Sequence, residues 1–290
     1  MTVQTYRIAP ATEPDGSGVA ANGAKCARCA YRTLCLPLGL GERDLARLEG
    51  VIGCRRRLAR GDVLFRAGQP FANLYALRFG HFMTCRDDHR GERYITAFQM
   101  AGDLMGMDAI GNGEHASTAI ALEDSEVCEV PYARLQALMA ELPQVMAHFH
   151  RVMSQEILRD QSAIRFLGML RADERMASLL LNLSARYAMR GFSPRRFQLR
   201  MSRDDMARYL GLQLETVSRL LARFRDQGLI CLERRELEIL DMRRLEAMAG
   251  GMHEAVEAQR PRPARPAGTA QAVHVIARQS VQGGSSCRTI

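Results

Sequence analysis

Short apolar runs separated by glycines fill the chain from residue 58 to residue 140. Stretches such as NLYALRFG and RYITAF have the composition of β-strands, and the glycines between such runs recur at the spacing of turns. The pattern therefore predicts a compact antiparallel β-roll over residues 58–140, preceded by a cysteine-containing lead-in over residues 26–57.

The pattern becomes helical over residues 141–170, where seam positions follow one another in alternating steps of four and three. That is the spacing of two helices packed side by side. Because the roll already has its own apolar positions, we expect a dimerisation helix and a homodimer. The seam positions are Met146, His150, Met153, Ile157, Asp160 and Ile164.

Asp160 is a polar residue in this otherwise mostly apolar seam. In a parallel homodimer it would face its own copy, and two carboxylates ~4 to 6 Å apart repel by a few kcal/mol at an effective dielectric near 20. The dimer would then be marginal. Alternatively, Asp160 tilts outward as an ordinary solvated residue next to Arg159.

Residues 171–250 are predicted to form a winged helix-turn-helix, so the fold class is α+β. MSRDDMARYL and LETVSRLLARF are two helical segments around Gly211, and LICLERRELEIL is a hairpin. Ser202 and Asp205 fit a capping box at the first helix.

Glu215, Ser218 and Arg219 share one face near the start of the second helix. In the major groove an arginine can donate two hydrogen bonds to guanine, and a glutamate can accept one from cytosine. We therefore assign base reading to these three residues. A solvated amphipathic hairpin is the alternative, which the tight turn and the following hairpin disfavour.

The composition of the chain indicates where the protein is located and what kind of partner it binds. The formal net charge is +8 and Lys25 is the only lysine, so the excess charge is arginine. Genome base composition alone can produce that arginine bias, but a basic balance favours an anionic partner such as nucleic acid, here the double-stranded DNA that a helix-turn-helix would bind. No membrane span or signal peptide is evident, and we expect a cytoplasmic protein. Residues 1–25 are predicted to be a mobile leader, and residues 251–290 a disordered tail.

Three cysteines, Cys26, Cys29 and Cys35, stand within ten residues. In a reducing compartment, clustered thiols indicate a metal site or a redox switch rather than disulfides. Thiolates can hold zinc or an iron-sulfur cluster, and the spacing does not separate the two. A fourth ligand could be any of the remaining cysteines, which are Cys54, Cys85, Cys128, Cys231 and Cys287.

The motifs CARCAYRTLCLPLGL, AGDLMGMDAIG, SEVCEVPYARL, RGFSPRRF and YLGLQLETVSRLLARF occur in this order. Over about residues 20–250 the chain resembles the fumarate and nitrate reduction regulator (FNR) branch of the cyclic-AMP receptor protein superfamily. The resemblance implies a cyclic-nucleotide-binding-like roll, a dimerisation helix and a winged helix-turn-helix. It also implies a transcription regulator that binds palindromic TTGAT-type sites.

The resemblance further implies an oxygen-labile 4Fe-4S cluster held by Cys26, Cys29, Cys35 and Cys128. It places an RNA polymerase contact in the loop that contains Phe192, Ser193, Pro194 and Arg195. It also matches Asp160 to a position whose charge opposes dimerisation. Ala30 departs from the serine that is common after the second cysteine, which leaves the rate of the oxygen response open.

Other functions have less support in the sequence. Leu104–Met107 and His115–Thr118 lack the acidic residue and the arginine with which related sensors hold a cyclic nucleotide, so no cyclic nucleotide is expected. We find no catalytic motif and predict no enzyme activity. The main alternative is a regulator of the same fold whose cysteines bind zinc or act as a thiol switch.

Overall fold

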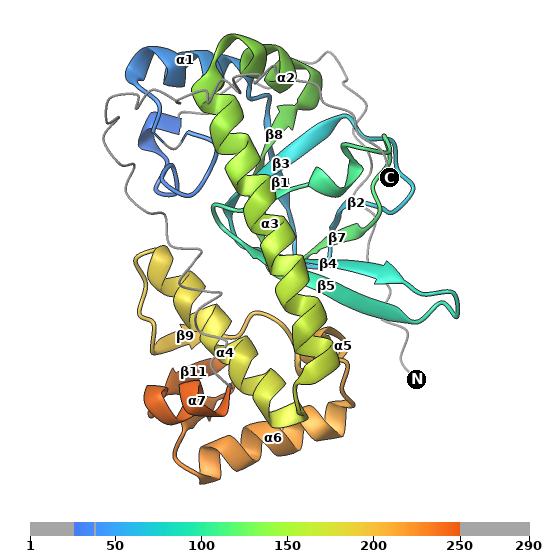
Figure 1. The fold of residues 1–290 in the computed structure, drawn as a ribbon, viewed down its shortest axis with the longest axis vertical. Helices are drawn as coiled ribbons and strands as arrows, with labels where there is room; N and C mark the ends of the chain where they lie inside the picture. The colour runs from blue at the N-terminus through green and yellow to red at the C-terminus, as the bar shows by residue number, and fades with distance from the viewer. Residues whose placement is uncertain (1–25, 38, 250–290) are drawn as a thin grey trace, which may run out of the picture. The chain divides into compact units, whose positions relative to one another are not determined.

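The computed structural model describes residues 26–37 and 39–249, apart from the side chains of residues 162–167. The predicted leader and tail, Cys287 and the side chain of Ile164 lie outside the described residues. The chain begins with η1 (Cys26–Arg28) and α1 (Glu42–Val51), and the strands of the roll follow (Figure 1). They are β1 (Arg55–Leu58), β2 (Val63–Phe65), β3 (Asn73–Phe79), β4 (His81–Asp87), β5 (Arg93–Met100), β6 (Leu104–Met105), β7 (Thr118–Ala121) and β8 (Ser125–Pro131), with η2 (Met107–Ala109) before β7.

The strands form two four-stranded antiparallel sheets, in the orders β1-β8-β3-β6 and β2-β7-β4-β5. A buried cluster joins both sheets, with Phe65 of one stacked on Tyr75 of the other at 5.6 Å between ring centroids. Gly80 links β3 to β4 at φ +94°, and a Cβ there would lie 2.0 Å from the Oγ of Ser125. This turn therefore requires glycine.

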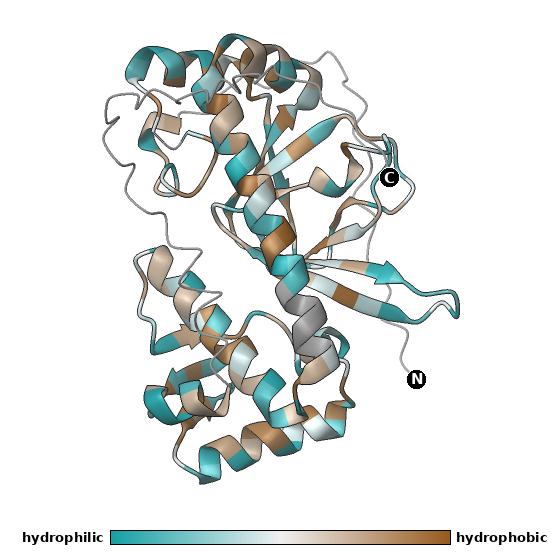
Figure 2. Cartoon of the chain, in the orientation of Figure 1, coloured by the Kyte–Doolittle hydropathy of each residue, from teal (hydrophilic) through white to brown (hydrophobic). Residues whose placement is uncertain are grey.

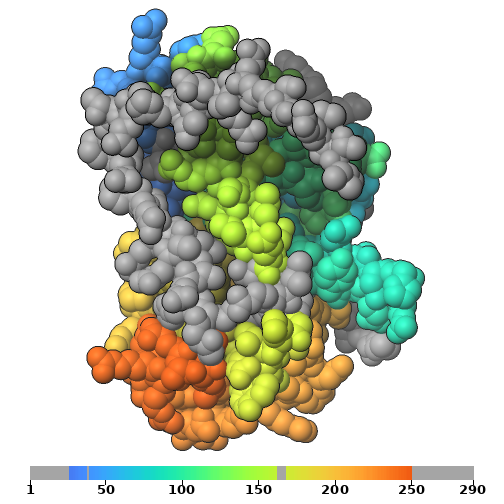
Figure 3. Space-filling view, in the orientation of Figure 1, coloured from blue at the N-terminus to red at the C-terminus, as the bar shows by residue number. Residues whose placement is uncertain are grey.

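Two helices follow the roll, α2 (Tyr132–Glu141) and the 27-residue α3 (Pro143–Met169). Pro143 begins α3, where its missing N–H costs no helical hydrogen bond. Val145 and Phe149 of α3 are buried in one cluster with residues of α1, β3 and β8. Figure 3 shows other atoms of α3, in yellow-green, on the surface of the molecule. One face of α3 thus packs on the roll and another lies at the surface.

The C-terminal segment is a helix-turn-helix with a small sheet. Its elements are α4 (Ala172–Met189), β9 (Arg196–Gln198), α5 (Arg203–Leu210), α6 (Leu214–Asp226), β10 (Ile230–Glu233), β11 (Glu236–Ile239) and α7 (Met242–Met248). The antiparallel strand order is β10-β11-β9, so the predicted hairpin is present and gains a third strand. The α+β fold class is therefore confirmed.

The roll and the C-terminal segment share an apolar cluster that includes Ile95 and Phe98 of β5 and Leu210 of α5. The rings of Phe98 and Tyr209 lie 5.1 Å apart. Figure 2 shows hydrophobic positions, in brown, interleaved with hydrophilic ones along α6 and the roll strands. Among the described helices, none has the length and apolar character needed to cross a membrane.

Candidate metal centre and DNA-reading face

The three clustered cysteines lie in a short hydrogen-bonded loop. Cys26 begins η1, and its carbonyl accepts the N–H of Cys29 at 3.0 Å. The N–H of Cys35 donates to the carbonyl of Tyr31 at 3.1 Å. These bonds fix the backbone that presents the three thiols. His148 of α3 contacts the same loop, because its Nε2 lies 3.1 Å from the carbonyl oxygen of Cys35.

Cys128 comes to this loop from β8, which lies between β1 and β3 in its sheet. It pairs with Arg55 on one side and Ala76 on the other. Cys26 and Cys128 are buried in the same apolar cluster, and Cys35 packs against it. The sheet thus holds Cys128 beside the cysteine loop, although it lies 93 residues after Cys35 in the chain.

The thiols influence one another's ionisation. Burial, together with the neighbouring Cys128, Glu49 and Cys29, raises the pKa of Cys26 to about 12. Burial also raises the pKa of Cys35, with added contributions from Cys26, Cys128 and Cys29. The pKa of Cys128 is raised by burial and by Cys29, against the lowering effect of Arg55. Without a cation among them, these groups stay neutral thiols.

The other described cysteines lie on different elements. Cys54 is exposed before β1 and donates to the carboxylate of Glu129 at 3.3 Å. Cys85 is buried on β4, where it donates to the carbonyl of Thr118, and Cys231 lies on β10 of the wing. All described cysteines are free thiols.

Among the described residues, no three side chains of His, Cys, Asp or Glu are grouped closely enough to hold one metal ion. A 4Fe-4S cluster places irons and sulfides between its protein ligands, so its thiolates stand farther apart than those around a single ion. The donor set of Cys26, Cys29, Cys35 and Cys128 consists of sulfur alone, which suits the thiophilic irons of such a cluster.

The DNA-reading segment begins with the predicted capping box. The Oγ of Ser202 accepts the N–H of Asp205 at 3.0 Å, and the carboxylate of Asp205 accepts the N–H of Ser202 at 2.7 Å. Gly211 ends α5 in the left-handed region at φ 62°. The capping box fixes the start of α5, and the left-handed Gly211 ends the helix and turns the chain toward α6.

The two faces of α6 separate as the sequence predicts. Val217, Leu220, Leu221 and Phe224 are buried. Glu215 and Arg219 are exposed, and Ser218 is half-buried. Arg223 lies 3.6 Å from Asp173 of α4, which ties α6 to the preceding helix. The structure thus brings Glu215, Ser218 and Arg219 together on one accessible helix face.

The arginines around this face differ in what they contact. Arg208 donates to the carboxylate of Asp204 at 2.8 Å and to the carbonyl of Arg93 at 3.1 Å, so its guanidinium turns toward the roll. Arg234 adopts φ 53° at the tip of the hairpin, and both Arg234 and Arg235 are exposed there. The wing therefore exposes two arginines at its tip, flanked by Glu233 and Glu236.

The seam residues of α3 occupy two environments. Met146 is 38% exposed, Ile157 is 55% exposed, and His150 and Asp160 are also exposed. Met153 instead packs against the apolar cluster of the roll. Burial raises the pKa of Asp160, and Arg159 lowers it in part. Arg159 itself pairs with Glu156 at 2.6 Å.

The predicted polymerase-contact loop follows α4. Phe192 is 53% exposed, and Ser193, Pro194 and Arg195 are exposed. The Oγ of Ser193 accepts the N–H of Arg195 at 3.2 Å. The Oγ of Ser184 donates to the carbonyl of Pro194. The loop is therefore held in shape while its side chains stay accessible.

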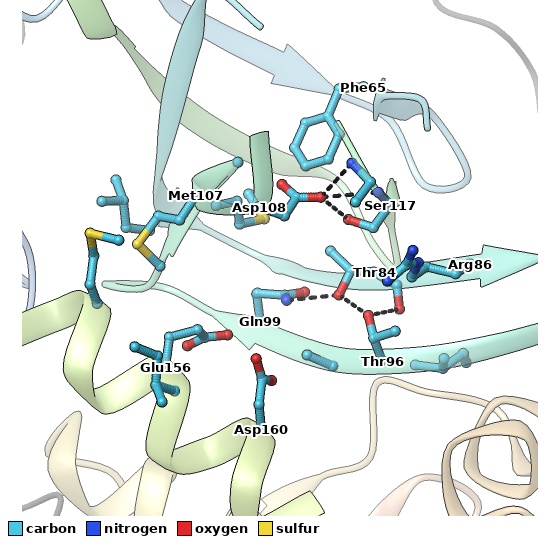
Figure 4. A pocket seen from close by; sticks show the side chains of 18 of the residues that line it. Phe65, Thr84, Arg86, Thr96, Gln99, Met107, Asp108, Ser117, Glu156 and Asp160 are labelled. Carbon is cyan, nitrogen blue, oxygen red and sulfur yellow. Dashed lines mark hydrogen bonds between the residues drawn. The ribbon is translucent and has the colours of Figure 1, made fainter. Parts of the chain in front are cut away.

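Sequence reasoning missed Asp108, which lies in a cavity between the roll and α3 (Figure 4). One oxygen of its carboxylate accepts the N–H groups of Ala116 and Ser117, each at 3.0 Å. The Oγ of Ser117 donates to the same oxygen at 2.8 Å. Burial alone would raise the pKa of Asp108, but its neighbours His115 and Ser117 hold it below the ordinary value. Only the fold shows that this carboxylate accepts hydrogen bonds from residues 116 and 117.

Glu156 and Asp160 of α3 line the same cavity, in which Figure 4 shows both carboxylates near Gln99. Burial raises the pKa of Glu156, and Arg159 lowers it in part. With Asp108, the cavity thus has three carboxyl groups on its wall.

Comparisons with known proteins agree with this architecture. A model of the Crp-like helix-turn-helix domain matches residues 174–248, and one of the cyclic nucleotide-binding domain matches residues 55–141. The fumarate and nitrate reduction regulatory proteins of Salmonella typhimurium (strain LT2) and Escherichia coli (strain K12) are each 42% identical over 225 residues, or 78% of this chain and 90% of theirs. The structure of FixK2 from Bradyrhizobium japonicum matches with a TM-score of 0.62 and 27% identity, over 67% of this chain and 96% of that one.

The β-roll, the long helix and the winged helix-turn-helix define a class of DNA-binding transcription regulators with an N-terminal domain of the cyclic nucleotide-binding type. Within that class, the chain belongs to the FNR branch of the CRP/FNR family. The predicted family membership is confirmed.

Proposed function

We propose that this regulator senses oxygen through a 4Fe-4S cluster held by Cys26, Cys29, Cys35 and Cys128. The single observation that carries the proposal is the meeting of these thiols, where each of Cys26, Cys35 and Cys128 has its pKa raised partly by other thiols of the set. Four thiolates in an apolar site are stable only with a strong positive charge between them. The names of the regulators at 42% identity support the same cofactor.

When bound, such a cluster supplies iron that oxygen can oxidise, which makes the site sensitive to air. The residues of the chain would hold the cluster and connect it to the rest of the fold. The loop of residues 26–35 contributes three ligands and β8 the fourth, so full ligation ties the loop to the sheet. His148 contacts the loop from α3, which extends this tie to the proposed dimerisation helix.

Homodimer formation through α3 is the second step of the proposal. Ile157 and Leu158 are 55% and 49% exposed in the single chain, and a second copy of α3 would cover them. Asp160 would meet its copy in that interface, so repulsion keeps the dimer marginal without the cluster. A marginal equilibrium responds strongly to a ligand that favours one state.

The dimer would present two α6 helices to half-sites of the TTGAT type about one helical turn apart. Arg219 would donate to guanine, and Glu215 would accept from cytosine. The loop of Phe192, Ser193, Pro194 and Arg195 would meet RNA polymerase at the promoter. A cyclic nucleotide is not part of this mechanism, because the N–H groups of Ala116 and Ser117 already donate to the carboxylate of Asp108.

Purification without air tests the proposal against zinc or a thiol switch. The account predicts a brown protein with about four irons and four sulfides per chain, whose visible absorption bleaches in air. A colourless protein with one zinc per chain, or with no metal, would leave the DNA-binding assignment intact and overturn oxygen sensing through a cluster.

A further inference from the structure

The turn between β5 and β6, residues 100–103, is tightly bonded to the roll. Its Asp103 carboxylate accepts the N–H of Met100 at 2.8 Å. The N–H of Gly102 donates to the carbonyl of Leu77 at 2.7 Å, and the N–H of Leu77 donates back to the carbonyl of Asp103 at 2.9 Å. We call residues 100–103 the β5–β6 turn; it is closed by its own side chain and fixed to β3.

Two arginines, Arg186 of α4 and Arg190 directly after its end, donate hydrogen bonds to this turn. Arg190 donates to Asp103 Oδ1 at 2.8 Å and to the carbonyl of Ala101 at 2.7 Å. Arg186 donates to the carbonyl of Phe98 at 2.7 Å and to Asp103 Oδ2. The side chains of Arg186, Arg190 and Asp103 are at most 10% exposed. Buried, charge-assisted bonds from both arginines thus fix α4 to the turn.

The cysteine loop lies against the same turn. Gly102 has φ +96°, and a Cβ built there would stand 3.0 Å from Cβ of Leu34 and 3.5 Å from Cβ of Tyr31. Leu34 and Tyr31 lie between Cys29 and Cys35, and the N–H of Leu34 donates to the carbonyl of Tyr31 at 3.0 Å. The segment that links two proposed ligands therefore touches Gly102, next to the residue that α4 holds.

We infer that the β5–β6 turn is a relay between the cysteine loop and the DNA-reading segment, with Asp103 as a positioning residue for α4. In a close-packed contact, movement of Leu34 either pushes Gly102 or leaves a gap beside it. The turn resists deformation because of its bonds to Leu77 and Met100, so displacement passes to Arg186 and Arg190. This route acts within one chain and is separate from dimerisation through α3.

The relay can be tested without any cofactor, by hydrogen exchange on the full, cluster-free chain. Leu34→Ala removes the outer side-chain atoms beside Gly102, including Cδ1 at 3.4 Å from the Cβ position built there, and keeps Leu34 Cβ and every cysteine in place. The relay predicts severalfold faster amide exchange over residues 183–189 of α4, although Leu34 belongs to the distant loop. The matched control is Leu40→Ala, a half-buried leucine that packs on the apolar cluster with Cys26 and Cys128.

Equal exchange in α4 for wild type, Leu34→Ala and Leu40→Ala would overturn the relay, as would equal acceleration in both variants. Asp103→Asn is the reciprocal probe, and it should accelerate exchange in residues 29–35 as well as in α4. Acceleration confined to α4 would show that Asp103 fixes α4 without reaching the loop, and would also reject the relay.

A second experiment rests on the proposed function. Anaerobically prepared Asp103→Asn should contain as much iron as the wild type and sediment as the same species, yet its affinity for the two-fold site should change less than threefold on exposure to air. A wild-type-like response to air would reject the relay. Absence of iron from the wild type would instead reject the proposed function, and the exchange experiment would still decide the relay.

Discussion

The DNA-reading segment and the cysteine site differ in how far along the chain their parts lie. Ser202, Gly211 and Arg219 stand within 18 residues of one another, and local hydrogen bonds set the geometry of α5 and α6. The cysteine site joins a loop to Cys128, and the apolar cluster around it draws on α1, β3, β8 and α3. The proposed reading face therefore depends on local structure, whereas the cysteine site depends on one sheet of the roll and the helices packed on it.

The two regions also differ in electrostatics. Glu215 and Arg219 are exposed charges on the surface of α6. Cys26, Cys35 and Cys128 are neutral groups whose ionisation is opposed by burial and by one another. Under the proposed function, the reading face would need no cofactor, whereas the thiol site would be completed by the cations of a cluster.

The largest expected effect is on the iron content of the protein, which depends on the thiol site and not on the reading face. Cys128→Ala should reduce iron from about four per chain to nearly none, because it removes one of four ligands. Cys85→Ala is the matched control, since it deletes another buried thiol of the roll. Iron analysis of anaerobic preparations measures both. Iron retained in Cys128→Ala, or lost equally in Cys85→Ala, would contradict the assignment.

Asp103→Asn tests the junction between the regions. Removing one partner of a buried ion pair typically costs ~3 to 5 kcal/mol of unfolding free energy. Burial alone would raise the pKa of Asp103, but Arg186 and Arg190 lower it well below its ordinary value near 4. A carboxyl group whose pKa is lower in the folded than in the unfolded chain stabilises the fold at pH values above its ordinary pKa. This contribution is lost as the pH falls.

The wild type should therefore lose part of its advantage over Asp103→Asn as the pH falls from about 5 toward 2. Denaturant unfolding of both proteins, without the cluster, gives the difference at each pH. A constant difference across this range would mean that Asp103 is not stabilised by its arginines.

Substitutions on α3 test whether dimerisation couples the two regions. Ile157→Asp removes an exposed apolar side chain of the proposed seam and adds charge, so it should weaken the dimer by roughly 100-fold or more, at ~1.5 to 3 kcal/mol for each of two copies. Asp160→Ala should strengthen the cluster-free dimer by relieving a few kcal/mol of repulsion. Analytical ultracentrifugation measures both, and dimer constants unchanged in both variants would place the interface elsewhere.

Arg219→Ala tests the reading face alone. It should cost ~1 to 3 kcal/mol of discrimination between the guanine-containing half-site and a substituted one. Arg203→Ala provides the control, because this exposed arginine on α5 would contact phosphate rather than bases, and its loss should then affect all sequences alike. Equal losses on specific and random DNA for Arg219→Ala would reject base reading by this residue.

The smallest expected effect concerns local stability. Ser202→Ala should lower the unfolding free energy by ~1 kcal/mol, because the first turn of α5 loses its cap. Ser154→Ala, an exposed serine inside α3, is the control. Thermal unfolding compares them, and equal melting temperatures for Ser202→Ala and the wild type would show that the cap contributes little.

These regions also differ in how well the sequence predicts them. The capping box, the turn at Gly211 and the buried stripe of α6 follow from residue spacing, because helices have a fixed period. The fourth thiol could not be chosen by spacing, since five cysteines remained and only strand pairing brings Cys128 beside the loop. Family resemblance supplied that choice. Asp103 escaped notice because Arg190 lies 87 residues away along the chain, and Asp108 because it binds backbone N–H groups, which no residue pattern reveals.

The most direct test of the account is a DNA-binding titration of anaerobically prepared protein, before and after exposure to air. The target would be a two-fold TTGAT-type site, and Cys128→Ala would be measured in parallel. The account predicts tight binding by the wild type before air, weak binding after it, and weak binding by Cys128→Ala in both conditions. Equal affinity of the wild type with and without air would contradict control of the reading face by the thiol site.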